Sequence, residues 1–277
     1  MRICRISVDG KTFLARREEE AYVVLPFHEL NDLLNHEDWM EAAQGAGRNI
    51  ALDLAREEIL FQPEHVFCIG LNYKGHIHET GKPTPEYPTV FAKFASSLTG
   101  PQSDVELPRN SHEVDWEVEL GIVIGKPARN VSVAQAAAHI AGYTVINDVS
   151  MRDWQSRTNQ WFQGKNFEAS TPVGAYLVTP DEIGDAQDLR ITCWIEGEIM
   201  QDGRTSDLLF GPLELVSYIS QFTTLLPGDL IATGTPSGVG MAKTPKRFLQ
   251  HGEVLVSEIE GIGTLANRFV STKLERT

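Results

Sequence analysis

The sequence predicts a β-rich α+β protein with a small N-terminal α/β domain, and three observations lead to this prediction. Short apolar runs, each about the length of a strand, alternate with Gly, Pro, Asn and Asp after Pro63. Only two stretches of that region have the apolar spacing of a helix. Strands and helices do not alternate, which argues against a doubly wound nucleotide-binding fold. Because the composition changes at Pro63, we predict domains of residues 1–62 and 63–277.

The N-terminal segment is predicted to hold a hairpin and two helices. Residues 2–14 alternate around Asp9-Gly10, which is typical of a β-hairpin. Residues 29–34 and 49–60 carry apolar side chains three and four positions apart, which indicates helices. In the main domain we expect strands over residues 65–71, 89–94, 118–124, 142–147, 174–178, 189–196, 229–233 and 253–259, and helices over 133–140 and 213–222.

Composition excludes several classes of protein. The 277 residues include 38 acidic and 24 basic side chains, so the net charge of −14 disfavours nucleic acid as a partner. No apolar run reaches the roughly 20 residues of a membrane span, and the first residues lack the apolar core of a signal peptide. Three cysteines without a CxxC pair argue against a disulfide framework or a zinc site. We therefore expect a cytoplasmic protein without membrane or nucleic-acid partners.

The segment from Val114 to Gly125, VDWEVELGIVIG, is the strongest chemical signal. Residues two apart share a face of a strand, so Glu117 and Glu119 point the same way, and the apolar residues after them indicate a buried strand. Buried neighbouring carboxylates need a cation or a proton. Asp148 ends another apolar strand and could supply a third oxygen, a set that favours Mg²⁺ or Mn²⁺. A solvated strand face and, for Asp148, a helix N-cap are the alternatives.

A histidine and a glutamate lie one helical turn apart in the stretch NYKGHIHE. His76 and Glu79 can therefore form a hydrogen bond, which would make the imidazole a general base for water. The alternative is a surface histidine near a glutamate. Glycines and prolines between residues 75 and 88 predict a mobile lid.

Two further motifs suggest groups that bind anions. Lys165 lies in an apolar stretch and needs a partner, for which the carboxylates are candidates; its ammonium could stabilise an oxyanion. A surface lysine is the alternative. Three glycines between residues 234 and 240 follow a strand and could form a backbone nest for a substrate carboxylate, or simply a tight turn.

The motifs together resemble the fumarylacetoacetate hydrolase family over residues 63–270. The stretches that carry the resemblance are NYxxHxxE, FxKxxSSLTGP, DWExELGxVIGK, GYTxxNDxSxRDxQ, QGKxFExSTPxG and LLPGDLIATGTPSGVG. The resemblance implies a mixed β-sandwich and roll in a homodimer, with a divalent cation on Glu117, Glu119 and Asp148. It assigns catalysis to His76, Glu79 and Lys165, and substrate binding to Tyr73, Lys93, Arg152, Gln155 and Thr235.

The resemblance also implies a reaction. We expect a hydrolase that cleaves the C3–C4 bond of an acylpyruvate, a 2,4-diketo acid such as fumarylpyruvate, with water activated by His76 and Glu79. Decarboxylation of oxaloacetate and isomerisation of a 2-hydroxydienoate are the alternatives on the same metal site. A non-enzymatic metal-binding relative is disfavoured, because neither the ligands nor the His–Glu pair is broken.

Overall fold

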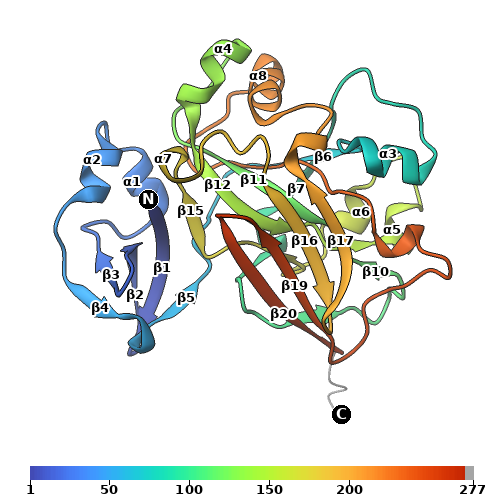
Figure 1. Ribbon diagram of the computed structural model, residues 1–277, viewed down its shortest axis with the longest axis horizontal. Helices are drawn as coiled ribbons and strands as arrows, with labels where there is room; N and C mark the ends of the chain where they lie inside the picture. Colours follow the sequence, from blue (N-terminus) through green and yellow to red (C-terminus); the bar gives the residue numbers. More distant parts are fainter. Residues whose placement is uncertain (272–277) are drawn as a thin grey trace.

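Two β-sheets form the centre of the molecule in the computed structural model, which describes residues 1–271 (Figure 1). The larger sheet contains β1 (Arg2–Val8), β2 (Lys11–Arg17), β3 (Ala21–Val24), β4 (Asn49–Ala51), β5 (Arg56–Glu58), β6 (Val66–Gly70), β7 (Thr89–Lys93), β11 (Val118–Ile124), β12 (Ile140–Asn147), β15 (Tyr176–Val178) and β18 (Leu230–Ala232). Its order is β4-β3-β2-β1-β15-β12-β11-β18-β6-β7, with β5 paired to β1.

The smaller sheet packs against the middle of the larger one. It has the order β17-β16-β19-β20-β9. Its strands are β9 (Val105–Leu107), β16 (Arg190–Ile195), β17 (Glu198–Arg204), β19 (Val254–Ile259) and β20 (Gly263–Ser271). Two short pairs complete the β-structure: β8 (Leu98–Thr99) with β14 (Thr171–Pro172), and β10 (Val114–Asp115) with β13 (Ser150–Met151).

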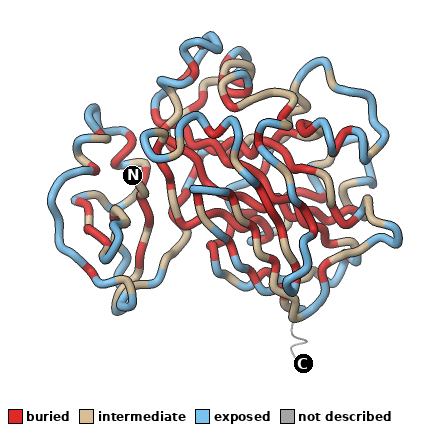
Figure 2. Tube along the Cα trace, viewed as in Figure 1, coloured by how far each residue is buried: buried red, intermediate tan, exposed pale blue. Residues whose placement is uncertain are grey.

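Strand β11 is buried along its whole length because both of its faces are covered (Figure 2). Leu120 and Ile122 belong to the core that includes Cys193 of β16, between the two sheets. Val123 points the other way, into a second core that includes Leu33. Apolar side chains on both faces of a strand are what double burial requires.

The helices are short and lie around the sheets. They are α1 (Leu30–Leu34), α2 (Trp39–Gln44), α3 (Lys74–Thr80), α4 (Val133–Ala136), α5 (Arg152–Gln155), α6 (Phe162–Lys165), α7 (Pro180–Ile183) and α8 (Pro212–Phe222), with 3₁₀ turns at 52–54, 95–97, 137–139, 205–207 and 240–242. Figure 1 shows α3, α5 and α6 gathered at one end of the sheets. These three helices carry side chains of the candidate site.

The predicted fold class is confirmed, and most of the predicted elements are present. Each of the eight predicted main-domain strands overlaps an observed strand, and β1 and β2 form the predicted hairpin. The predicted helix over residues 213–222 is α8, and the one over 133–140 is α4 followed by a 3₁₀ turn. The strands that were not predicted include β17 and β20, which form hairpins with β16 and β19 in the smaller sheet.

The helix predicted over residues 49–60 is wrong. These residues form β4, a 3₁₀ turn and β5, because β4 pairs with β3 and β5 pairs with β1. Ile50 is buried, but Leu54 is 64% exposed, so their spacing of four does not mark one buried face. Pairing with available strand edges outweighs a weak local helical pattern.

The first strand also belongs to the sheet of the main domain. Ile3 of β1 lies opposite Leu177 of β15 in an antiparallel pair. The domain boundary at residues 62 and 63 stays a prediction, and residues 272–277 of the predicted second domain lie outside the described residues. Within residues 1–271, no helix is long and apolar enough to cross a membrane.

Candidate metal and catalytic site

Three buried carboxylates meet where β11 and β12 lie side by side. Val118 pairs with Asn147 across the two antiparallel strands, so Glu117, Glu119 and Asp148 are brought to the same end. The amide of Asp148 donates a hydrogen bond to the carbonyl of Glu117 at 2.8 Å. One carboxylate oxygen from each residue lies within 4.8 Å of those from the other two. The fold therefore concentrates three carboxyl groups in one buried cluster.

Two of these carboxylates are neutralised by buried cations. Lys165 Nζ donates to Glu117 Oε2 at 2.5 Å and to Asp148 Oδ2 at 2.7 Å. Lys93 Nζ reaches Asp148 Oδ1 at 2.6 Å, and Arg152 Nη1 lies 2.6 Å from Glu117 Oε1. Although burial opposes ionisation of Glu117, Arg152 and Lys165 hold the pKa of its carboxyl well below the ordinary value. Although burial lowers it, the pKa of Lys165 is raised overall by Asp148 and Glu117.

Glu119 has no such counter-ion. Its Oε2 accepts a hydrogen bond from the amide of Gly234 at 2.8 Å, and among residues 1–271 no lysine or arginine forms an ion pair with it. Burial and the charges of Asp148 and Glu117 raise the pKa of Glu119 well above its ordinary value. A cation in the cluster would supply the missing charge, because each carboxylate oxygen keeps a second lone pair for ligation. An all-oxygen set of this kind fits Mg²⁺ or Mn²⁺.

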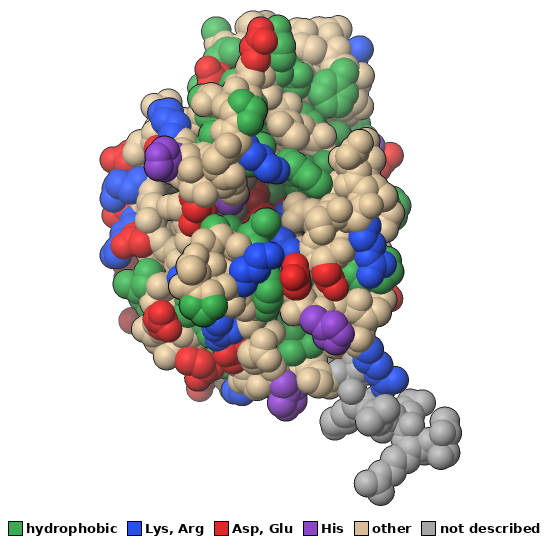
Figure 3. All heavy atoms as spheres, turned by 90° about the vertical axis from the view of Figure 1, so that its right-hand side faces the viewer, with side chains coloured by type: hydrophobic (Ala, Val, Ile, Leu, Met, Phe, Trp, Pro, Cys, Tyr) green, Lys and Arg blue, Asp and Glu red, His purple; other side chains and the backbone are tan. Residues whose placement is uncertain are grey.

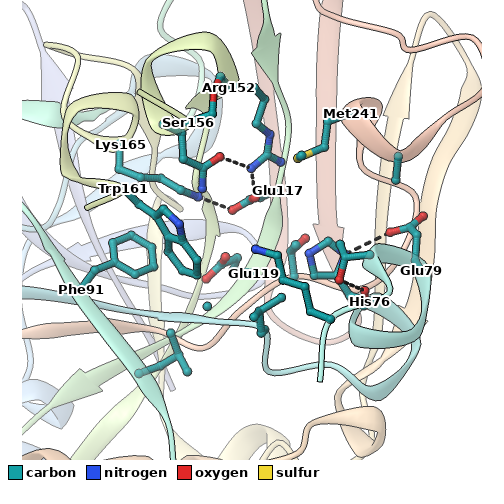
Figure 4. A pocket seen from close by; sticks show the side chains of 18 of the residues that line it. His76, Glu79, Phe91, Glu117, Glu119, Arg152, Ser156, Trp161, Lys165 and Met241 are labelled. Atoms are coloured by element: carbon teal, nitrogen blue, oxygen red, sulfur yellow. Dashed lines mark hydrogen bonds and ion pairs between the residues drawn. The ribbon is translucent and has the colours of Figure 1, made fainter. Parts of the chain in front are cut away.

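A histidine–glutamate pair lies on α3, at the edge of the same cavity (Figure 4). His76 Nδ1 is 3.0 Å from Glu79 Oε2, and Glu79 Oε1 accepts a hydrogen bond from the amide of Gly238 at 2.9 Å. Gly81 ends the helix in a left-handed conformation with φ of 65°, which suits glycine. When Nδ1–H donates to Glu79, Nε2 of His76 is the nitrogen left to accept a proton.

The cavity has a volume of about 590 Å³ and opens on the face that carries α3, α5 and α6. Figure 3 shows side chains of both charges on this face. In Figure 4, His76 and Glu79 lie on one side of the cavity and Lys165, Trp161 and Phe91 on the other, with Glu117 and Glu119 between them. Its lining includes His76, Glu79, Lys82, Phe91, Glu117, Glu119, Arg152, Gln155, Trp161, Lys165, Thr235 and Met241.

Arg152 and Gln155, two of the predicted substrate-binding residues, line this cavity. Arg152 Nη1 donates to Gln155 Oε1 at 2.9 Å, which links the two side chains. Arg152 Nη2 is buried and has no hydrogen-bond partner within residues 1–271. A buried unpartnered donor in a cavity wall is suited to a substrate oxygen. The assignment of Arg152 and Gln155 to substrate binding stays a prediction.

Two other residues assigned to substrate binding, Lys93 and Tyr73, are not part of the cavity lining, and their assignment stays a prediction. The side chain of Lys93 is 0% exposed, and its ammonium is held by Asp148. Tyr73 is also 0% exposed, and burial raises the pKa of its hydroxyl.

The glycine loop also differs from its prediction as a nest for a substrate carboxylate. The amides of Gly234 and Gly238 bind Glu119 and Glu79, and that of Gly240 donates to Asp115 at 2.7 Å. The loop packs directly against these acids, so its amides bind carboxylates of the chain itself. The hydroxyl of Thr235 lines the cavity but donates to the carbonyl of Val118 at 2.9 Å, so its proton is already used.

Asp115 and the aromatic pair Phe91 and Trp161 also belong to the site, although neither was predicted from the sequence. Asp115 is fully buried, and its Oδ2 accepts a hydrogen bond from Arg152 Nε at 2.8 Å. A signal for it existed, since Asp115 has the same two-residue spacing as the pair of glutamates. Phe91 and Trp161 come from distant segments, and no local pattern relates them.

An oxygen-ligand cluster beside a His–Glu pair in a β-rich fold defines the class as a metal-dependent enzyme. Residues 65–270 match the protein-family model described as fumarylacetoacetate (FAA) hydrolase C-terminal. The chain belongs to the fumarylacetoacetate hydrolase family.

Relatives of this family have several activities. The human protein named oxaloacetate tautomerase FAHD2A, mitochondrial, is 46% identical over 224 residues, which are 78% of this chain and 71% of the human protein. The solved structure of a fumarylacetoacetate hydrolase from Exiguobacterium antarcticum has a TM-score of 0.90 and 31% identity, over 98% of this chain and 100% of that one. Fumarylpyruvate hydrolase from Pseudomonas aeruginosa, in complex with Mn²⁺ and pyruvate, has a TM-score of 0.71 and 32% identity, over 77% of this chain and 92% of that one.

Proposed function

We propose that this protein interconverts the keto and enol forms of oxaloacetate, and that Mg²⁺ or Mn²⁺ supports the reaction. The observation that carries the proposal is that His76, fixed by Glu79, lines the same cavity as the acidic cluster. Tautomerisation moves a proton between C3 and the oxygen on C2 and breaks no carbon–carbon bond. One base close to the bound 2-oxo group is therefore sufficient for this chemistry.

The residues of the cavity have different roles in this reaction. A divalent cation held by Glu117, Glu119 and Asp148 would polarise the 2-oxo group and make the C3 protons more acidic. His76 Nε2 takes a proton from C3, and the imidazolium then gives it to the oxygen on C2, which completes the enol. Glu79 keeps the imidazole oriented and stabilises its protonated form. In the reverse direction, the protonated imidazole returns the proton to C3.

The relatives support a tautomerase more than a hydrolase. The human protein at 46% identity is named an oxaloacetate tautomerase, and the bovine protein of the same name is 45% identical to this chain over 224 residues. The fumarylpyruvate hydrolase is 32% identical. Since the hydrolase is the more distant of these relatives, tautomerisation is the first proposal.

Acylpyruvate hydrolysis, the reaction expected from the sequence, is the second candidate. The same His76–Glu79 pair can activate a water molecule, and a cavity of about 590 Å³ has room for an acyl group beside the pyruvate portion. Attack of that water on C4 would break the C3–C4 bond and release pyruvate and a carboxylic acid.

One set of assays separates the candidate reactions. The protein loaded with Mn²⁺ is mixed with oxaloacetate in deuterated water, and enol absorbance, deuterium at C3, pyruvate and CO₂ are followed. We expect the wild type to give faster interconversion and deuterium exchange than His76→Ala, and we expect EDTA to abolish this difference. The release of pyruvate should not rise above the background. Release of pyruvate and CO₂ without faster interconversion identifies a decarboxylase instead. Cleavage of acylpyruvates without an effect on oxaloacetate identifies a hydrolase.

A further inference from the structure

Lys82 differs from the other cations in the wall of the cavity. The lysines and arginines that line it are Lys82, Arg152 and Lys165. Arg152 and Lys165 both form ion pairs with Glu117. Lys82 has no carboxylate partner among the ion pairs of residues 1–271, and its side chain is exposed. Its positive charge is therefore available to an anion that enters the cavity.

The position of Lys82 is set by two neighbours. It directly follows Gly81, the residue that ends α3, so the same short segment carries His76 and Lys82. Its ammonium lies over the ring of Trp161, 5.4 Å from the ring centroid. A cation–π contact of this kind keeps an ammonium in place without neutralising its charge.

Trp161 in turn is held in the cavity wall because the backbone at Gly70 lies close to its ring. Its ring packs edge-on against Phe91, with centroids 5.6 Å apart. A Cβ atom at Gly70 would lie 2.2 Å from Cζ3 of Trp161, so only glycine leaves room for the ring there. Trp161, which precedes α6, therefore packs on Gly70 of β6 and Phe91 of β7, with its ring under the ammonium of Lys82.

We propose that Lys82 binds the second carboxylate of the substrate and selects dicarboxylic 2-oxo acids over monocarboxylic ones. This inference rests on the proposed function and adds the residue that recognises the second carboxylate. The 2-oxo acid end of the substrate belongs at the acidic cluster, which leaves the other end to the cavity wall. Because the protein has a net charge of −14, a dianion gains from a local cation where it binds.

The test compares two substrates that share the 2-oxo acid end. Deuterium exchange at C3 is measured with oxaloacetate and with pyruvate, which lacks the second carboxylate, for the Mn²⁺-loaded wild type, Lys82→Met, Lys82→Arg and Lys74→Met. Lys74, the first residue of α3, is an exposed lysine outside the cavity lining, so it controls for loss of charge.

We expect Lys82→Met to lower kcat/KM for oxaloacetate about 10-fold, mainly through KM, as loss of one partly exposed charge-assisted contact does. Exchange of pyruvate stays as in wild type, Lys82→Arg retains most of the oxaloacetate activity, and Lys74→Met changes neither substrate. An equal loss for both acids, or no loss for oxaloacetate, overturns the proposal.

A binding measurement keeps this proposal separate from the proposed reaction. If the wild type exchanges neither acid, the proposed function fails, and calorimetry on the Mn²⁺-loaded protein decides the role of Lys82. Weaker binding of oxaloacetate but not of pyruvate in Lys82→Met then supports the role. Unchanged binding of oxaloacetate overturns it.

Discussion

Arg152 and Asp115 form a buried ion pair, in which Arg152 Nε donates to Asp115 Oδ2 at 2.8 Å. Asp115 also accepts hydrogen bonds from the amides of Gly240 and Met241, at 2.7 and 3.0 Å. It therefore ties β10, α5 and the glycine loop together directly below the cavity. The guanidinium that it holds is the one that reaches Glu117 in the acidic cluster.

Replacing Asp115 with Asn should destabilise the protein strongly. The change leaves the buried guanidinium of Arg152 short of one negative partner, and breaking a buried pair typically costs about 3–5 kcal/mol. Chemical denaturation of the two proteins measures the difference. Asp202→Asn is the matched control, since the Asp202–Arg190 pair is about half exposed and should contribute little. Equal stability of Asp115→Asn and wild type would show that the pair is not a structural support.

Glu119→Gln should weaken metal binding while the fold survives. The amide has nearly the same volume but no charge, so the cluster loses the carboxylate that lacks a counter-ion. Calorimetric titration with Mn²⁺, together with circular dichroism, checks both parts. Glu86→Gln removes an exposed acid and should leave metal binding unchanged. Wild-type affinity for Mn²⁺ and unchanged metal dependence in Glu119→Gln would contradict the assignment of Glu119 as a ligand.

His76→Ala should reduce tautomerisation by about 10²–10⁴-fold, the usual contribution of a general base. Glu79→Gln should have a smaller effect of the same kind, because the imidazole stays in place but loses its negative partner. Initial rates on oxaloacetate, with pyruvate release followed in parallel, measure both variants. Decarboxylation needs no base, so any such activity should fall less. If the two activities fell by the same factor in both variants, His76 and Glu79 would serve a shared step and not proton abstraction from C3.

The segment from α3 to residue 88 should become more protected when oxalate binds. Oxalate mimics the enolate of a 2-oxo acid, and closure of α3 over it would exclude water from the cavity. Hydrogen exchange of the Mn²⁺-loaded protein, with and without oxalate, measures this. Strand β11 is buried on both faces and serves as the internal reference, since its protection should not change. Identical protection of the α3 segment in the two samples would argue against a lid.

Gly70→Ala should displace Trp161 and alter the cavity wall. The new Cβ overlaps the rigid indole ring, and overpacking of this kind costs about 1–3 kcal/mol. The double variant Gly70→Ala/Trp161→Phe should recover part of the stability, because a smaller ring leaves space. Thermal unfolding of the single and double variants forms the cycle. Additive effects in that cycle would mean that the two residues do not meet in solution.

Local periodicity accounts for what could be predicted from the sequence. The apolar runs of β11 and β12, and the two-residue spacing of Glu117 and Glu119, follow from the alternation of side chains on a strand. The three-residue spacing of His76 and Glu79 reflects one helical turn and, in the structure, a hydrogen bond. The helix predicted over residues 49–60 was wrong because the spacing of apolar residues within a short segment does not show which strand edges elsewhere in the fold are free to pair with it.

The sequence by itself determined the β-rich fold class, the paired acids and the His–Glu pair, because each is a relation between residues close in the chain. Only the tertiary structure decided that Lys93 forms an ion pair with Asp148, and that the amides of the glycine loop bind the chain's own carboxylates. It also decided that Lys82 lies over Trp161. These contacts join segments that are tens of residues apart in the chain. The order of the strands in the sheets decides which segments meet, and no local sequence pattern encodes that order.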